Sequence, residues 1–97
     1  MTPEAGFEKR VLDSAAKQKR IIEFVALFRE EHGFPPTIRE ITRGAEISST
    51  SMVSYHLTLL VEKGFLTKDP NSARTIVLTP EGKDFIAQQD TDGLQNH

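Results

Sequence analysis

The 97-residue sequence contains no cysteine, and none of its apolar runs approaches the length of a membrane span. A chain without cysteine has no disulfide framework and no thiolate metal site. A helical span needs roughly 20 consecutive apolar residues, and the first ten residues, MTPEAGFEKR, lack the apolar centre of a signal peptide. We therefore expect a cytoplasmic protein that does not contact a membrane.

Catalytic and metal-binding patterns are also missing. The sequence has no Ser-His-Asp combination, no glycine-rich phosphate loop and no carboxylate dyad. His56 lies beside an apolar stripe without other ligand-type residues at suitable spacing, a pattern that indicates a half-buried structural histidine. We predict no catalytic residue, no bound metal and no cofactor, so the protein is not expected to be an enzyme.

Positive charge is scarce as well. The formal net charge of −2 argues against a nucleic-acid partner. The charge is unevenly spread, however, because residues 15–79 hold nine Lys or Arg against seven Asp or Glu, and residues 80–97 hold one against four. The mildly basic centre permits nucleic-acid binding but does not by itself indicate it.

The chain is long enough for one domain with its own core but not for two. Residues 15–32 have apolar side chains at helical spacing, including Ile21, Val25 and Phe28, and Gly33 with Pro35-Pro36 ends this helix. Two interpretations remain open for residues 1–14: a flexible leader or a short docking helix. We expect the domain to cover residues 15–89 and residues 90–97 to be a disordered tail.

Two further helices are predicted by their boundary signals. Thr37-Ile38-Arg39-Glu40 is a capping box, so a short helix starts at Ile38. Ser48 or Ser49 caps the next helix, which ends at Gly64. The turn between them places Glu46 where glycine is usual, so either Glu46 has a positive φ, which would cost roughly 1 kcal/mol, or the turn differs slightly in shape. Two helices joined this way form a helix-turn-helix.

The remaining chain predicts a hairpin and a last helix. Residues 65–68 and 74–78 are strand-like and flank a five-residue loop of turn-forming residues, 69–73. Thr79-Pro80 then opens a helix with an N-cap and a proline at the first helical position. The predicted fold is therefore mostly α with a small β-hairpin: a winged helix-turn-helix with a three-helix core, a two-stranded wing and a C-terminal helix.

The predicted third helix has an unusual outer face. Opposite its apolar stripe it carries Ser51, Ser54, Tyr55 and Thr58, which are hydroxyl-bearing and uncharged. Capping explains Ser48 and Ser49, but Ser54 and Tyr55 lie more than a turn inside the helix. A helix in the major groove needs groups that hydrogen-bond to base edges. We predict that Ser51, Met52, Ser54 and Tyr55 read bases, with Met52 on the flank.

Contacts to the DNA backbone are predicted around this helix and on the wing. Lys68 and Arg74 flank the hairpin tip, where a wing can follow the backbone or enter the minor groove. Thr37 has two roles that we hold equally open, capping and binding a phosphate at a helix N-terminus. The predicted backbone and wing contacts are Thr37, Arg39, Ser49, Thr50, Thr58, Lys68, Asn71, Ser72 and Arg74.

The segment from Lys17 to Leu78 resembles the N-terminal DNA-binding domain of the LexA repressor family. The joint from Leu78 to Gly82 is more similar to that of MarR-type regulators. LexA proteins continue into a self-cleaving Ser-Lys peptidase domain that also dimerises them, and 97 residues leave no room for one. The residues that carry the LexA resemblance are Gly33-Phe34-Pro35-Pro36-Thr37, Arg39-Glu40-Ile41, Ser48-Ser49, His56-Leu57, Leu60, Lys63-Gly64 and Asp69-Pro70.

The resemblance implies a DNA-binding winged helix, although the base-reading positions differ from those of the best-known members, so the operator does not carry over. We expect a sequence-specific transcriptional regulator of double-stranded DNA, a repressor of bacterial or phage origin, with a homodimer on a palindromic site. The alternative is a winged-helix module that binds protein, since a fold alone does not fix function.

Overall fold

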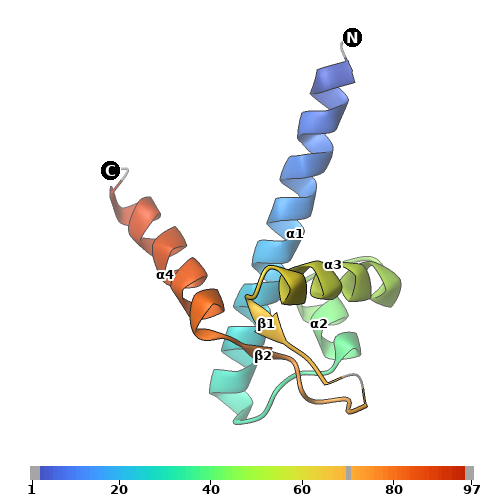
Figure 1. Cartoon of the computed structure of the whole chain (residues 1–97), viewed down its shortest axis with the longest axis vertical. Coiled ribbons are helices and arrows are strands. Elements are labelled where there is room, and N and C mark those ends of the chain that lie inside the picture. The colour runs from blue at the N-terminus through green and yellow to red at the C-terminus, as the bar shows by residue number, and fades with distance from the viewer. Residues whose placement is uncertain (1–2, 70, 96–97) are drawn as a thin grey trace.

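The computed structural model describes residues 3–69 and 71–95, with the side chains of residues 13–69 and 71–88. The predicted winged helix-turn-helix is confirmed (Figure 1). Three helices are followed by a two-stranded antiparallel hairpin and a last helix. The elements are α1 (Pro3–His32), α2 (Ile38–Gly44), α3 (Thr50–Glu62), β1 (Leu66–Thr67), β2 (Val77–Leu78) and α4 (Pro80–Gln95).

The core lies where α1, α2 and α3 meet under the hairpin. α1 contributes Ile21, Ile22 and Val25, which recur at helical spacing on one side of the helix. The strands close the core with Leu66 and the residue just before β2, Ile76. The other buried members are Ile41, Ala45, Ile47, Val53, Leu57 and Leu60.

α1 is longer than predicted. It is one continuous helix from Pro3, so residues 3–14 are neither a flexible leader nor a separate short helix. Proline suits the first helical position, and no other proline interrupts the chain before Pro35. Figure 1 shows the N-terminal half of α1 extending beyond the body. α4 likewise continues to Gln95 through most of the expected tail, whose residues 96–97 lie outside the described ones.

The turn between α2 and α3 adopts the first of the two alternatives, a positive φ at Glu46. Glu46 has φ 57°, in the left-handed region that disfavours side chains other than glycine. Its neighbours hold it there: the Ala45 N–H donates to the Ile41 carbonyl at 2.8 Å, and the Ile47 N–H donates to the Thr42 carbonyl at 3.0 Å. Ala45 and Ile47 are buried. Packing on both sides of Glu46 therefore offsets the local backbone strain.

The hairpin differs from the prediction, because its strands are shorter and its loop is longer. Each strand has two residues, paired Leu66 with Leu78 and Thr67 with Val77, rather than 65–68 with 74–78. Beyond these pairs, the Thr75 hydroxyl accepts the Asp69 N–H at 2.9 Å. A side chain thus takes a position that a backbone ladder would otherwise fill, and the loop runs from residue 68 to residue 76.

Candidate nucleic-acid interface

The outward face of α3 is exposed and is uncharged from Ser51 to Thr58, with Glu62 as its one charged residue at the C-terminal end. Val53, His56, Leu57 and Leu60 fix the helix from below because they are buried in the core. On the opposite side Tyr55 is 59% exposed and Met52 36% exposed, Ser51 is exposed, and Ser54 is half-buried. The four predicted base-reading residues therefore lie together on the solvent side of one helix.

Ser49 opens this helix. It is the N-cap of α3, and its hydroxyl accepts the Met52 N–H at 3.1 Å. Thr50 is the first helical residue and is exposed. Further along, the Thr58 hydroxyl donates to the Ser54 carbonyl at 3.0 Å, so part of its hydrogen-bonding capacity is used within the helix. The cap leaves the other N–H groups of the first turn pointing toward the helix start.

A polar network holds the buried side of α3 to α1. The Gln18 amide lies 3.2 Å from His56 Nδ1, and its oxygen accepts from Lys63 Nζ at 2.9 Å. Because that oxygen faces Lys63, the amide N–H₂ faces the imidazole, which accepts as the neutral tautomer. Burial lowers the pKa of His56, and the charges of Lys17 and Lys63 lower it further. His56 is buried, where the sequence predicts a half-buried structural histidine.

The N-terminus of α2 carries the predicted capping box. The Thr37 hydroxyl accepts the Glu40 N–H at 3.2 Å, and Glu40 Oε1 accepts the Thr37 N–H at 2.8 Å. Both polar groups of Thr37 that could bind a phosphate therefore have partners within the protein. Arg39 in this turn is exposed.

The predicted contacts on the wing differ in their surroundings. Lys68, Asn71 and Ser72 are exposed. Lys68 has no hydrogen-bond or ion-pair partner among the described residues. Arg74 instead pairs with Glu40, because its Nη1 and Nη2 donate to the two carboxylate oxygens at 3.0 and 3.2 Å. The two basic side chains of the wing, which the sequence treats alike, are therefore not equivalent.

The comparison with known families agrees with this geometry. A family model described as the LexA DNA binding domain matches residues 13–75, from the middle of α1 to the second half of the wing. The chain belongs to the LexA DNA-binding domain family.

Several proteins with sequences similar to this chain are LexA repressors. The LexA repressor of Limosilactobacillus reuteri is 43% identical over 70 residues, which cover 72% of this chain and 34% of that protein. The LexA repressor of Anaeromyxobacter sp. is 41% identical over 70 residues (72% of this chain, 30% of that protein), and that of Enterococcus faecalis is 41% identical over 75 residues (77% and 36%). The chain thus spans about a third of the length of these relatives.

Two polar residues that organise this LexA-type domain were missed by sequence reasoning. Glu40 was recognised as a cap but not as the partner of Arg74, which follows it by 34 positions. Gln18 was not singled out, although its position three residues before Ile21 places it on the apolar stripe of α1. A polar residue at a buried helical position is a usable signal, because it requires a hydrogen-bond partner.

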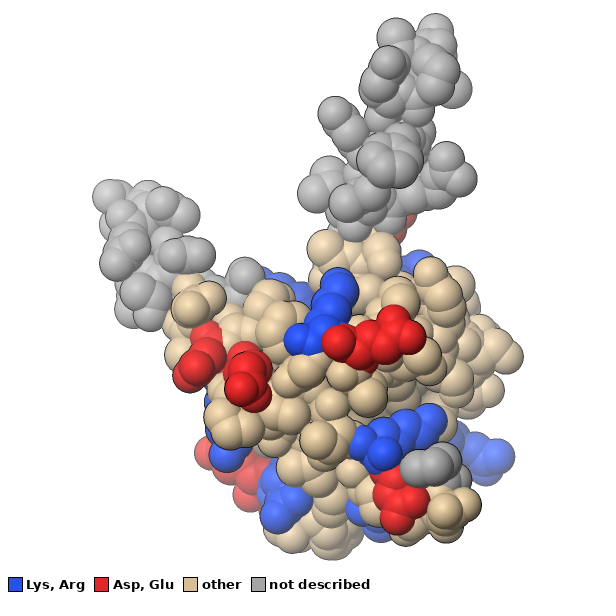
Figure 2. All heavy atoms as spheres, in the orientation of Figure 1, with Lys and Arg blue, Asp and Glu red and all other residues tan. Residues whose placement is uncertain are grey.

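The surface of this LexA-type domain has no single large basic patch on the side drawn in Figure 2, where Lys and Arg alternate with Asp and Glu over the described residues. Within the described part of the chain, none of the helices has the length and apolar character needed to cross a bilayer. No group of His, Cys, Asp and Glu in that part could hold a metal ion.

Proposed function

We propose that this protein is a sequence-specific transcriptional repressor of double-stranded DNA. In this proposal α3 enters the major groove and the wing contacts the backbone or the minor groove. The observation that carries it is the outward face of α3, where hydroxyls and one tyrosine ring are exposed and no charged residue lies between Ser51 and Thr58. A face of this composition suits hydrogen bonding to base edges and contact with thymine methyl groups.

Each predicted contact then has a place in the proposal. Ser51, Ser54 and Tyr55 read base edges, and Met52 makes an apolar contact beside them. Thr37 and Ser49 act mainly through the helix starts that they cap, because N–H groups at a helix N-terminus attract phosphate. The remaining exposed polar residues contact the backbone: Arg39, Thr50, Thr58, Lys68, Asn71 and Ser72. Arg74 has a different role, argued below.

The proposal is tested by binding to a random duplex across a salt series. Phosphate contacts give non-specific affinity at low salt that falls as salt rises. Ser51→Glu, which adds a carboxylate to the outward face of α3, should weaken binding more than tenfold. Gln88→Glu is the matched control, since it adds the same charge on the exposed surface of α4. Undetectable binding of the unmodified protein at low salt would reject the proposal and favour the protein-binding alternative.

We further propose that two copies bind a palindromic site together. A domain with few basic residues makes few phosphate contacts, so one copy should bind weakly. A two-fold dimer matches the symmetry of a palindrome. We assign no catalytic activity or cofactor to the protein and place it in the bacterial cytoplasm, where a regulator of this kind acts.

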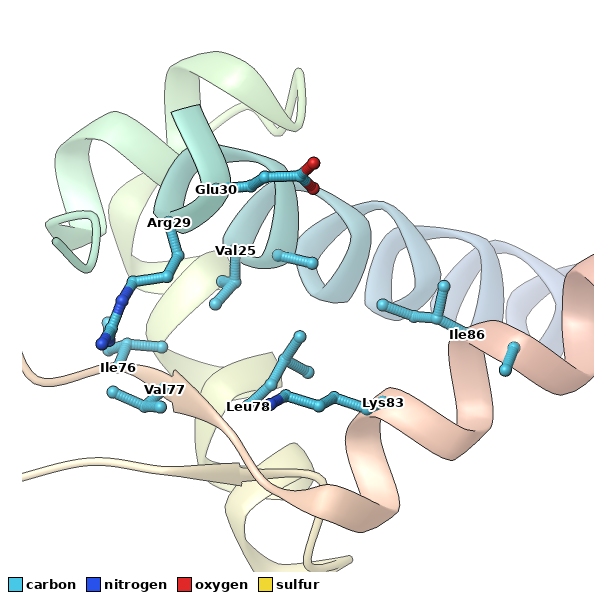
Figure 3. Close-up of a pocket in the computed structure, with 10 residues that line it drawn as sticks. Val25, Arg29, Glu30, Ile76, Val77, Leu78, Lys83 and Ile86 are labelled. Carbon is cyan, nitrogen blue, oxygen red and sulfur yellow. The ribbon is translucent and has the colours of Figure 1, made fainter. Parts of the chain in front are cut away.

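The proposed dimer surface is a groove between α1, β2 and α4. It has a volume of about 530 Å³ and apolar walls that include Val25, Leu78 and Ile86 (Figure 3). Arg29, Glu30 and Lys83 also line it, with Arg29 and Glu30 on α1 and Lys83 on α4. Figure 1 shows α1 and α4 diverging on the side away from the wing tip, so a partner seated here leaves the wing accessible.

A second copy of this chain is the occupant that the charges suit. α4 exposes Glu81 and Asp84 beside Lys83, so it carries both signs within one turn. In a two-fold pairing the acidic groups of one α4 can meet Arg29 and Lys83 of the other copy, and the same contacts occur twice. The apolar floor of each groove is then covered by the partner's helix.

The dimer surface is tested by light scattering on the purified protein across a concentration series. Ile86→Asp should shift the population to monomer, because it puts a carboxylate on the apolar floor. Leu27→Asp is the control on another face of α1, where Leu27 is 52% exposed. A monomeric unmodified protein at all concentrations contradicts the dimer, and dissociation by Leu27→Asp alone places the interface elsewhere.

A further inference from the structure

The wing tip is weakly fixed by its own hairpin. Only two residue pairs form the ladder, and so short a hairpin is marginal in water. Bonds within the tip give it shape: the Asn71 N–H donates to Asp69 Oδ1 at 2.9 Å, and the Ser72 N–H donates to the Asp69 carbonyl at 3.2 Å. These bonds join the tip to itself, so they do not set its position relative to the helices.

Arg74 joins the tip to the helical body. Its Nη1 donates to the Pro35 carbonyl and to Glu40 Oε1, both at 3.0 Å, and its Nη2 donates to Glu40 Oε2 at 3.2 Å. The guanidinium also lies over the Phe34 ring, 4.8 Å from its centroid. The fork shape of arginine permits this two-point pairing, which a lysine ammonium cannot reproduce.

Glu40, the partner of Arg74, lies in the first turn of α2, and its side chain is held in place there. One of its oxygens also accepts the Thr37 N–H at 2.8 Å as part of the capping box. The carboxylate is therefore oriented by α2 before the wing reaches it. The chain leading into β2 thus meets two consecutive segments of the body, the linker after α1 and the first turn of α2, which precede Arg74 by 39 and 34 positions.

The geometry points to Arg74 as a wing-positioning residue that holds the tip against the N-terminus of α2 through Glu40, rather than as a phosphate contact. This inference rests on the proposed DNA-binding function. Glu40 and the Pro35 carbonyl already use three of the five N–H donors of Arg74, and the Glu40 carboxylate pairs with its charge, so Arg74 is a poorer phosphate contact than an unpaired cation. Lys68, which is exposed and has no such partner among the described residues, is left as the basic side chain of the wing that contacts phosphate.

Two substitutions separate positioning from direct contact. Arg74→Lys keeps the positive charge, so a simple phosphate contact would survive, but it loses the fork that pairs with Glu40. Glu40→Gln keeps an acceptor for the cap, since glutamine also serves in a capping box, but it removes the charge that holds Arg74. If Arg74 contacted DNA directly, Glu40→Gln would free it and leave binding unchanged or tighter.

We expect both variants to weaken DNA binding by roughly five- to tenfold, with the double variant no weaker than either single one. Lys68→Ala is the contrasting control: it should reduce the salt dependence by about one phosphate contact without loosening the tip. In the free protein, the ¹⁵N heteronuclear NOE of the Asp69, Ser72 and Thr75 amides should fall in Arg74→Lys and Glu40→Gln and stay unchanged in Lys68→Ala.

The two readouts keep the inference separate from the function on which it rests. Normal tip NOE values in Arg74→Lys and Glu40→Gln overturn the positioning role. So does unchanged or tighter DNA binding by Glu40→Gln. If the unmodified protein binds no DNA, the proposed function fails, and the NOE measurement alone decides whether Arg74 positions the tip.

Discussion

α3 and the wing are both proposed to touch DNA, but the protein holds them in opposite ways. α3 is fixed from below, by four buried side chains, so its outer side chains need no role in stability. The described residues of the wing tip include no buried side chain of this kind. The tip is joined to the helical body by Arg74, which pairs with Glu40. An element with a buried face can expose all its polar groups, whereas one without a buried face must use some of them to hold its position.

The comparison extends to the base of the wing, which does have a buried side. Leu66 in β1 and Ile76 before β2 are almost fully buried. α4 presses on the same place, since the Thr79 N–H donates to the Phe65 carbonyl at 3.1 Å and the Phe65 and Phe85 rings lie 5.1 Å apart. The wing is therefore two parts: a packed base and a tip held by polar contacts.

The largest loss of stability is expected from Gly82→Ala, which disturbs the packing at the base of the wing. A Cβ at Gly82 would collide with the Phe65 carbonyl oxygen and with the Leu78 side chain. The backbone cannot move aside as a flexible side chain does, so the overpacking should cost about 1–3 kcal/mol. Thermal unfolding followed by circular dichroism should show a fall of roughly 4–8 °C for each kcal/mol lost.

Gln88→Ala is the control for this measurement, because Gln88 is exposed on the same helix. It should change the unfolding temperature little. Equal temperatures for Gly82→Ala and Gln88→Ala would show that the base tolerates the extra methyl group, and the division of the wing into a packed base and a polar tip would lose its support.

The packed parts of the molecule are those that the sequence predicts best. Ile21 and Val25 recur at helical spacing. Thr37 and Glu40 mark the start of one helix through bonds between close neighbours, and Gly64 marks the end of another. These signals are local, so they survive without knowledge of the fold. The same periodicity predicts which residues of α3 are buried. The remaining residues of the helix are then predicted to face outward. The four base-reading candidates were found in this way.

The tip could not be predicted by the same means. Arg74 and Glu40 are 34 positions apart, and nothing local distinguishes Arg74 from Lys68 as the residue that finds a partner. The strand lengths were overestimated because Thr75, a good strand residue by composition, bonds to Asp69 through its side chain. The start of α1 was missed because Pro3 and Gly6 make the local helix signal ambiguous in this segment.

The second prediction tests the outer face of α3. Tyr55→Ala should change the preferred base at one or two positions by about 1–3 kcal/mol. The unfolding temperature should stay the same, because Tyr55 is 59% exposed. Competition binding among duplexes that differ at single positions measures the change. Lys68→Ala should instead lower the affinity for all duplexes by the same factor. If Tyr55→Ala also lowers the affinity for all duplexes equally, Tyr55 is not a base-reading residue.

The third prediction concerns how α3 begins. Ser49→Ala removes the acceptor of the Met52 N–H and should cost about 1 kcal/mol in the free energy of unfolding. Ser48→Ala is a matched control one residue earlier, since Ser48 is exposed and lies outside the helix. Denaturant unfolding distinguishes them. Equal losses would mean that the serine run stabilises α3 by something other than the cap.

The smallest effect concerns pH and the buried side of α3. Because the pKa of His56 lies below its usual 6.5 in the folded protein, the unfolded chain takes up the proton more readily. Stability is therefore complete above about pH 7 and declines as the pH falls through 6.5 toward the lower folded value. Protonation would also put an N–H on Nδ1 against the Gln18 amide, whose oxygen faces Lys63.

Denaturant unfolding from pH 7 to pH 5 in His56→Leu separates this slope from other groups. The variant should be less stable at every pH, because Gln18 loses one of its hydrogen-bond partners, but the decline in this window should disappear. Glu40 does not interfere: its pKa is lowered from 4.5, chiefly by its hydrogen bond with Arg74, so its contribution is lost only at more acidic pH. If the decline persists unchanged in His56→Leu, His56 is not its cause. The polar network beneath α3 then does not make the stability of the protein depend on pH.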